Sequence, residues 1–113
     1  MIFVRGDTFE FKFQRKTKDK QVITEKPDKM YFTVKNNDTE NDYIFQKSLG
    51  DNTISYDEET YYYHVTIDPE DTNDLDYGTY YYDIEIITNN KVKTISIGTL
   101  SITSEITFSS NEV

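Results

Sequence analysis

Apolar and polar residues alternate with a period of two in segment after segment, and this alternation most constrains how the chain can fold. It is clearest in TFEFKFQ (8–14), KMYFTVK (29–35), YYYHVTI (61–67) and TYYYDIEI (79–86). Side chains that alternate in this way point to opposite faces of a β-strand, whereas one face of a helix recurs about every 3.6 residues. Each segment therefore predicts a half-buried strand of an antiparallel sheet.

The remaining predicted strands are shorter or more mixed in pattern. They are DYIFQKSL (42–49), TISY (53–56) and KVKTISIGTLSIT (91–103). The last of them changes phase along its length. Its first two isoleucines, Ile95 and Ile97, lie in one phase of the alternation. Leu100 and Ile102 lie in the other phase, so we expect a β-bulge or bend at Gly98 to restore the inward direction.

The breaks between these segments carry residues typical of turns. Asn89 and Asn90 separate two strand patterns, and asparagine tolerates a positive φ, so they predict a two-residue hairpin. In DPEDTNDL (68–75), Pro69 stands where a first helical turn accepts proline, and acidic residues follow it. One short helical turn is therefore expected before the TYYYDIEI strand. About seven strands in 113 residues predict a single all-β domain, an antiparallel β-sandwich spanning residues 1–113.

The stretch LDYGTY (75–80) predicts a particular corner of that sandwich. Leu75, Gly78 and Tyr80 have the spacing of a tyrosine corner in Greek-key proteins. We expect the ring of Tyr80 to be buried and its hydroxyl group to bond to backbone near the short helical turn. Tyr81 is the alternative if the strand phase differs by one residue.

Composition and charge exclude several classes of function. The net charge of -9 disfavours a nucleic-acid-binding protein, because phosphate neutralisation supplies most non-specific affinity for nucleic acids. Without cysteine there is no disulfide framework and no thiol ligand or nucleophile. We find no apolar run long enough to span a bilayer and no signal-peptide pattern at the start, so no membrane association is expected.

The charge is divided unevenly along the chain. Residues 1–35 carry a net charge of +4 and residues 36–113 a net charge of -13. Such a split could support head-to-tail contacts between copies, so a homo-oligomer is a hypothesis from the sequence. Exposed strand edges offer a second route to assembly, the addition of a strand by a partner.

No catalytic, cofactor or metal site is expected. The acidic residues Asp68, Glu70, Asp71, Asp74 and Asp76 crowd one loop, where their oxygen atoms could hold calcium, and a calcium-dependent domain is a third possible function. However, the loop lacks the spacing and glycine of an EF-hand, and acidic residues suit the start of a helix without an ion. The single histidine, His64, lies in the outer phase of its strand with no nucleophile nearby in the sequence. An enzyme is therefore not expected.

Three surface features have a plain structural interpretation beside a functional one. Arg5, Gly6 and Asp7 spell an integrin-recognition tripeptide, but a turn before a strand is the more plausible role. The basic cluster, which we interpret as a solvated hairpin tip, comprises Lys12, Arg15, Lys16, Lys18 and Lys20. Three outward tyrosines could form an interaction surface for a protein or a sugar if their strands are neighbours: Tyr31, Tyr62 and Tyr81.

The order of these segments resembles a known family. The segments that carry the resemblance are RGDTFEFKFQRK, KPDKMYFTVK, YYYHVTIDPEDTNDLDYGTYYYDIEI, KVKTISIGTLSIT and the terminal EITF. Together they resemble the immunoglobulin-like N-terminal domain of phage baseplate upper proteins and related tail proteins of phages and prophages of Gram-positive bacteria. The resemblance covers nearly the whole chain.

This resemblance implies structural work in a virion. It implies an immunoglobulin-like β-sandwich that docks onto other phage tail or baseplate proteins, with no catalytic residues. The helical and receptor-facing portions of a full baseplate upper protein have no counterpart in this sequence, so we expect a free-standing virion component made in the bacterial cytoplasm. The alternative function is a carbohydrate-binding or host-adhesion module, since sandwich domains with surface aromatic residues often bind glycans.

Overall fold

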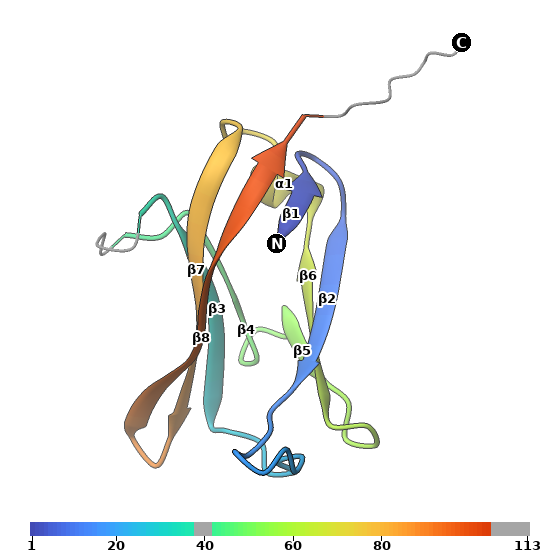
Figure 1. Cartoon of the computed structure of the whole chain (residues 1–113), viewed down its shortest axis with the longest axis vertical. Helices are drawn as coiled ribbons and strands as arrows, with labels where there is room; N and C mark the ends of the chain where they lie inside the picture. Colours follow the sequence, from blue (N-terminus) through green and yellow to red (C-terminus); the bar gives the residue numbers. More distant parts are fainter. Residues whose placement is uncertain (38–41, 105–113) are drawn as a thin grey trace.

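A computed structural model describes residues 1–37 and 42–104, which form a β-sandwich of two sheets (Figure 1). The strands are β1 (Ile2–Val4), β2 (Phe9–Gln14), β3 (Lys29–Lys35), β4 (Phe45–Ser48), β5 (Ile54–Tyr56), β6 (Tyr62–Ile67), β7 (Gly78–Thr88) and β8 (Lys91–Thr103). A four-residue helix, α1 (Pro69–Thr72), precedes β7, as predicted. No helix in these ranges is long and apolar enough to cross a membrane. The predicted EITF segment lies outside the described residues.

The strand order within each sheet is that of an immunoglobulin domain. The five-stranded sheet has the order β1-β8-β7-β3-β4 and the three-stranded sheet the order β2-β6-β5. Strands β2 to β8 thus occupy the positions of strands B, C, C′, D, E, F and G. The prediction of about seven strands is confirmed, with the short β1 as an eighth. The pairing is antiparallel as expected except at this added strand, because β1 runs parallel to β8.

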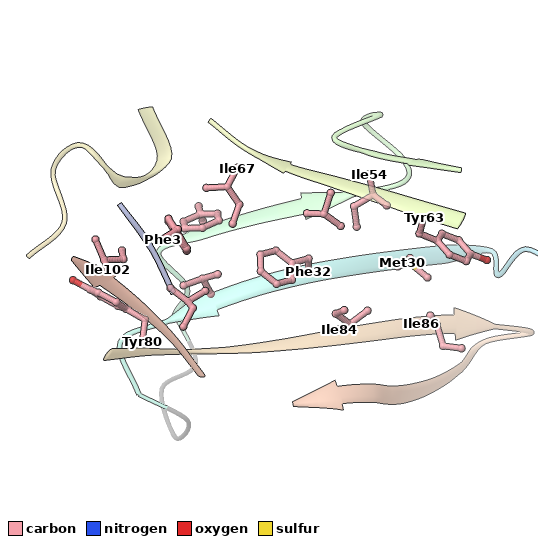
Figure 2. Close-up of a cluster of buried hydrophobic side chains, with 14 residues drawn as sticks. Phe3, Met30, Phe32, Ile54, Tyr63, Ile67, Tyr80, Ile84, Ile86 and Ile102 are labelled. Atoms are coloured by element: carbon pink, nitrogen blue, oxygen red, sulfur yellow. The ribbon is translucent and has the colours of Figure 1, made fainter. Parts of the chain in front are cut away.

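The core forms from the inward rows of both sheets, as the period of two predicted (Figure 2). Phe32 of β3 packs edge-on against Phe11 of β2, with 5.3 Å between the ring centroids. Val65 and Ile84 lie buried in the same cluster. The buried apolar residues are Phe3, Met30, Phe32, Val34, Phe45, Ile54, Tyr63, Val65, Ile67, Tyr80, Ile84, Ile86, Leu100 and Ile102.

The phase change of β8 occurs at Ile95 and not at Gly98, which corrects the prediction. The ladder between β7 and β8 skips Ile95, so this residue is the extra one of a β-bulge. Gly98 keeps a regular position opposite Tyr82. A Cβ atom on Gly98 would lie 2.6 Å from the Tyr82 hydroxyl oxygen. The glycine is therefore required by the tyrosine ring that covers it, and not by a bend of the backbone.

The predicted hairpin between β7 and β8 is confirmed. Asn89 and Asn90 both adopt positive φ, 51° and 64°, and Thr88 pairs with Lys91 across them. Positive φ at both central residues matches the right-handed twist of the flanking strands.

Tyr80 occupies the corner that LDYGTY predicted. Its ring is 6% exposed, and its hydroxyl group donates a 2.6 Å hydrogen bond to the Asp76 carbonyl oxygen. Gly78 has a φ of 145°, which glycine adopts far more readily than other residues, and Leu75 packs against the core. Tyr81 points to the outer face, so the alternative phase does not apply.

Replacement of Tyr80 by phenylalanine removes the corner hydrogen bond and keeps the ring. We expect Tyr80→Phe to lower the free energy of unfolding by about 1 kcal/mol, the usual net worth of one such bond. Urea unfolding followed by circular dichroism measures this difference. Tyr81→Phe, which removes a hydroxyl group from the outer face, serves as the control and should change stability little.

The pH dependence gives a second readout of the same residue. Burial raises the pKa of Tyr80 above its ordinary value of 10.0. Above pH 10.0 the unfolded chain loses a proton that the folded chain retains, so the free energy of unfolding decreases as pH rises through this window. Tyr80→Phe should lack this part of the decrease, and identical alkaline profiles would contradict burial of the phenol.

The contact between Gly98 and Tyr82 predicts a coupled effect of two substitutions. Gly98→Ala should lower the free energy of unfolding by about 1–3 kcal/mol, because the new methyl group displaces the Tyr82 ring. In a Tyr82→Ala background the same change should cost little, and a double-mutant cycle of urea unfolding measures the difference. Gly50→Ala is the control, since nothing lies within 4 Å of its Cβ position. Equal losses in both backgrounds would contradict the contact.

Candidate functional site

The acidic loop, residues 68–76, forms salt bridges with a lysine side chain. The ammonium group of Lys47, a residue that is only 5% exposed, lies 2.6 Å from an Asp71 carboxylate oxygen and 3.7 Å from one of Asp68. Asp71 also accepts a 2.7 Å hydrogen bond from the Asp68 backbone N–H group. These contacts join β4 to the start of α1. Within residues 1–37 and 42–104, no group of three or more metal-binding side chains forms a potential ion site.

The Arg5-Gly6-Asp7 tripeptide packs against the loop that follows α1. The Arg5 guanidinium group donates hydrogen bonds to the Leu75 carbonyl oxygen and the Tyr77 hydroxyl group, and it lies 4.2 Å from the Tyr77 ring centroid. Gly6 has a φ of 83° within a turn after β1. The predicted turn before the strand is confirmed. The contacts of the arginine, which were not predicted, engage it in the fold.

His64 lies on the outer face of the three-stranded sheet, in register with Lys12 on one side and Ser55 on the other. It is half-buried. Lys12 and Ser55, which pair with it, do not form with His64 the acid–base arrangement that activates a nucleophile.

The structure does not bring the three outward tyrosines together. Tyr31 and Tyr81 lie on the outer face of the five-stranded sheet, whereas Tyr62 belongs to β6 in the opposite sheet. Tyr31 is in register with Glu85 and Tyr81 with Lys35, so the two are four positions apart along their strands. This spacing corresponds to about 13 Å. The hypothesis of one surface formed by all three residues is therefore wrong.

The outer face of the five-stranded sheet has one apolar feature near Tyr81. Ile97 is 76% exposed there, and together with Tyr81 and Thr33 it borders a shallow hollow of about 260 Å³. Polar and charged residues interrupt this face, including Asp83 in register with Ile97.

A larger feature lies on the side of the sandwich between β2 and β8, which we call the open side. β2 is an edge strand, and β8 pairs with β1 only over Ser101–Thr103. Figure 1 shows β1 beside the end of β8, with the rest of β8 facing β2 across this side. Among the described residues, no strand pairs with the outer edge of β2 or with the outer edge of β8 from 91 to 98.

The inward side chains on the open side are incompletely covered. Tyr63, Val65 and Ile67 of β6 are fully buried at 0% exposure. The inward row of the neighbouring β2, which consists of Phe9, Phe11 and Phe13, is only half-buried. Large aromatic side chains contribute most to stability when they are fully removed from water, so this row retains apolar area that a partner could cover.

Phe11 and Phe13 of this row line a groove of about 550 Å³, which we call the open-side groove. Its apolar lining consists of Met1, Phe11, Phe13, Ile23, Tyr82, Ile84 and Ile95. Arg15, Lys16 and Lys93 border it, and no aspartate or glutamate is among its lining residues. The Arg15 guanidinium group is positioned by a 3.1 Å hydrogen bond to the Glu25 carbonyl oxygen. Gln14, Thr94 and Ser96 add polar groups to the lining. In a chain with a net charge of -9, the groove thus combines apolar and polar side chains with a basic border.

The sequence predicted the inward phase of Phe11 and Phe13 and the basic cluster with Arg15 and Lys16, but not that these residues line one groove. The predicted basic cluster does form a turn at its tip, where the Lys20 backbone N–H group bonds to the Thr17 carbonyl oxygen. Lys18 and Lys20 are exposed, yet Arg15 and Lys16 of the same cluster border the groove. In the sequence, the groove is indicated only by FEFKFQRK, where a row of inward phenylalanines is followed by basic residues. This pattern indicates a groove only once β2 is known to be an edge strand.

No protein-family model matches this chain, and no curated protein shows significant sequence similarity to it.

The ion pair between Lys47 and Asp71 allows a test of whether the acidic loop has a structural role. We expect Lys47→Met to lower the free energy of unfolding by about 1–3 kcal/mol, because Asp71 keeps its low exposure and loses its cation. Thermal or urea unfolding measures the change, and Lys91→Met at an exposed position is the control. Unchanged stability would contradict a structural role for the pair.

Proposed function

We propose that this chain is a non-enzymatic structural protein of a phage or prophage tail or baseplate, and that its sandwich joins other proteins through the open side. The observation that carries the proposal is the open-side groove, where half-buried phenylalanines lie between two strand edges. Its partners would be other tail or baseplate proteins, with no cofactor and no nucleic acid involved.

Two strand edges, those of β2 and β8, border the groove. Unpaired backbone N–H and C=O groups at an edge form a template for an added strand. An extended segment placed in the groove could bond to one edge and direct every second side chain toward Phe11, Phe13 and Ile95. The added segment would thereby gain both backbone hydrogen bonds and apolar contact, which is the usual basis of strand addition.

The proposed location in a virion is supported by the resemblance of three sequence segments to a phage protein domain. GDTFEFKF, PEDTNDLDYGTYYYDIE and KTISIGTLSI are the segments that resemble the baseplate upper protein domain most closely. An inert sandwich with one adhesive side suits such a role, because tail parts are assembled from symmetric protein contacts.

The alternative, a carbohydrate-binding or adhesion module, has less support from the geometry. A sugar platform would need aromatic rings gathered on one face, and Tyr62 lies on the sheet opposite to that of Tyr31 and Tyr81. Tyr31 and Tyr81 are also separated along their strands. Failure of the pure protein to bind cell-wall polysaccharide, with binding of tail proteins retained, would further favour assembly.

Mass spectrometry of purified particles tests the proposal directly. Particles released by the strain that carries the gene should contain this chain in a fixed ratio to the major tail protein. Ile95→Asp, which places a charge in the groove, should reduce its incorporation at least tenfold, whereas Ile97→Asp on the outer face of the same strand should not. The chain's absence from particles, with abundant chain in the cell, would contradict the proposal.

A further inference from the structure

We infer that the open-side groove binds residues 105–113 of a second copy of this chain. The inference rests on the proposed assembly role of the same groove and names its occupant. The second copy would add its segment as a strand along the free edge of β2 or β8, with Ile106 and Phe108 inserted among the half-buried aromatic side chains.

The first observation is that the apolar row of β8 continues in the sequence beyond the sandwich. Leu100 and Ile102 are the inward residues of β8 and are buried. Ile106 and Phe108 follow in the same phase of alternation. However, the last pair of the ladder between β1 and β8 is Val4 with Thr103. The chain thus has two apolar residues with strand spacing after the point where its own ladder ends, and these residues lie outside the described part.

The second observation is the fit of such a strand to the groove. Alternate side chains of a strand are spaced about 6.6–6.8 Å apart on one face. The rings of Phe11 and Phe13, which face the groove from β2, are 6.3 Å apart. An isoleucine and a phenylalanine two positions apart therefore match the spacing of the side chains that they would cover. The groove volume of about 550 Å³ provides room for both.

The third observation is charge. The groove is bordered by Arg15, Lys16 and Lys93, without an acidic residue in its lining. Residues 105–113 contain Glu105 and Glu112 and no lysine or arginine. Opposite charges at the border favour this segment over a basic one and fix its orientation in the groove.

Ile106 and Phe108 of the same chain cannot reach this position, because even Phe108, five residues beyond Thr103, lies at most about 18 Å from it. Ile106 is three residues beyond Thr103, so it lies at most about 11 Å from it. Ile95 lies eight positions back along β8 from Thr103, which corresponds to about 26 Å. β1 also occupies the intervening edge at Ser101–Thr103. If Ile106 and Phe108 fill the groove at Ile95, they therefore come from another copy, and repeated exchange would give a ring or a filament.

Two full-length variants with matched charge test the inference. Ile106→Asp/Phe108→Asp removes both apolar side chains, whereas Thr107→Asp/Ser109→Asp adds the same charge in the opposite phase. Sedimentation of the wild-type protein should show an oligomer, which the first variant converts to a monomer and the second retains. Circular dichroism of each variant verifies that the sandwich is folded. A monomeric wild-type protein, or equal loss of assembly in both variants, would overturn the inference.

A peptide of residues 104–113 then tests the groove itself. We expect it to bind the folded Ile106→Asp/Phe108→Asp protein and to shift NMR signals of β2 and β8. Lys93→Glu in the same background should weaken this binding at least tenfold, and Lys91→Glu, with the same change in charge outside the groove, should not. No binding, or binding that moves only signals of the outer sheet face, would overturn the inference.

These results are separable from the test of the proposed function. If the chain is incorporated into particles but neither assembles with itself nor binds the peptide, then the occupant is wrong and the assembly role stands. If the chain assembles through residues 105–113 but is absent from particles, then the proposed location in a virion is wrong and the inference stands.

Discussion

Packing of inward aromatic and branched side chains between the two sheets holds this domain together. Phe32 lies at the centre and contacts Phe11, Phe45 and Tyr82, with ring centroids 5.3–6.4 Å apart. Full burial of one such side chain contributes about 1.5–3 kcal/mol. The contribution is large enough to accommodate a local defect: the buried Tyr63 hydroxyl group has no hydrogen-bond partner in the described part of the chain, while its ring stacks on Phe13 at 5.3 Å.

The packing between the sheets is completed at one end of the open side and not at the other. Near the corner, β1 brings Phe3 over Phe9 with 5.1 Å between ring centroids, and the Arg5 and Lys47 contacts tie the loop after α1 and the helix start to the sheets. Farther along β2, Phe11 and Phe13 have no such cover among the described residues and remain half-buried. One part of the domain is thus closed by its own chain, and the other part provides the surface that we assign to assembly.

The sequence predicted the strands well because their pattern is local. Alternation alone placed Met30, Phe32 and Val34 inside, and all three are fully buried. The Tyr80 corner was also predictable, because Leu75, Gly78 and Tyr80 act within six residues of one another. Gly98 was misread because the need for glycine comes from the Tyr82 ring on another strand, which spacing along one strand does not reveal. The groove was missed for the same reason, since its residues come from β2, β7 and β8 and become a site only when these strands border the open side.

The Asn89–Asn90 turn has a consequence for the order of folding. Every residue of β7 pairs with β8, and the first pairs to form are separated by only a few residues in sequence. Short loops close with the smallest loss of chain entropy, so this hairpin can form within microseconds. Pairing of β2 with β6 joins residues about fifty positions apart and forms far more slowly. The nucleus of the transition state should therefore contain β7 and β8, and the three-stranded sheet should dock onto them last.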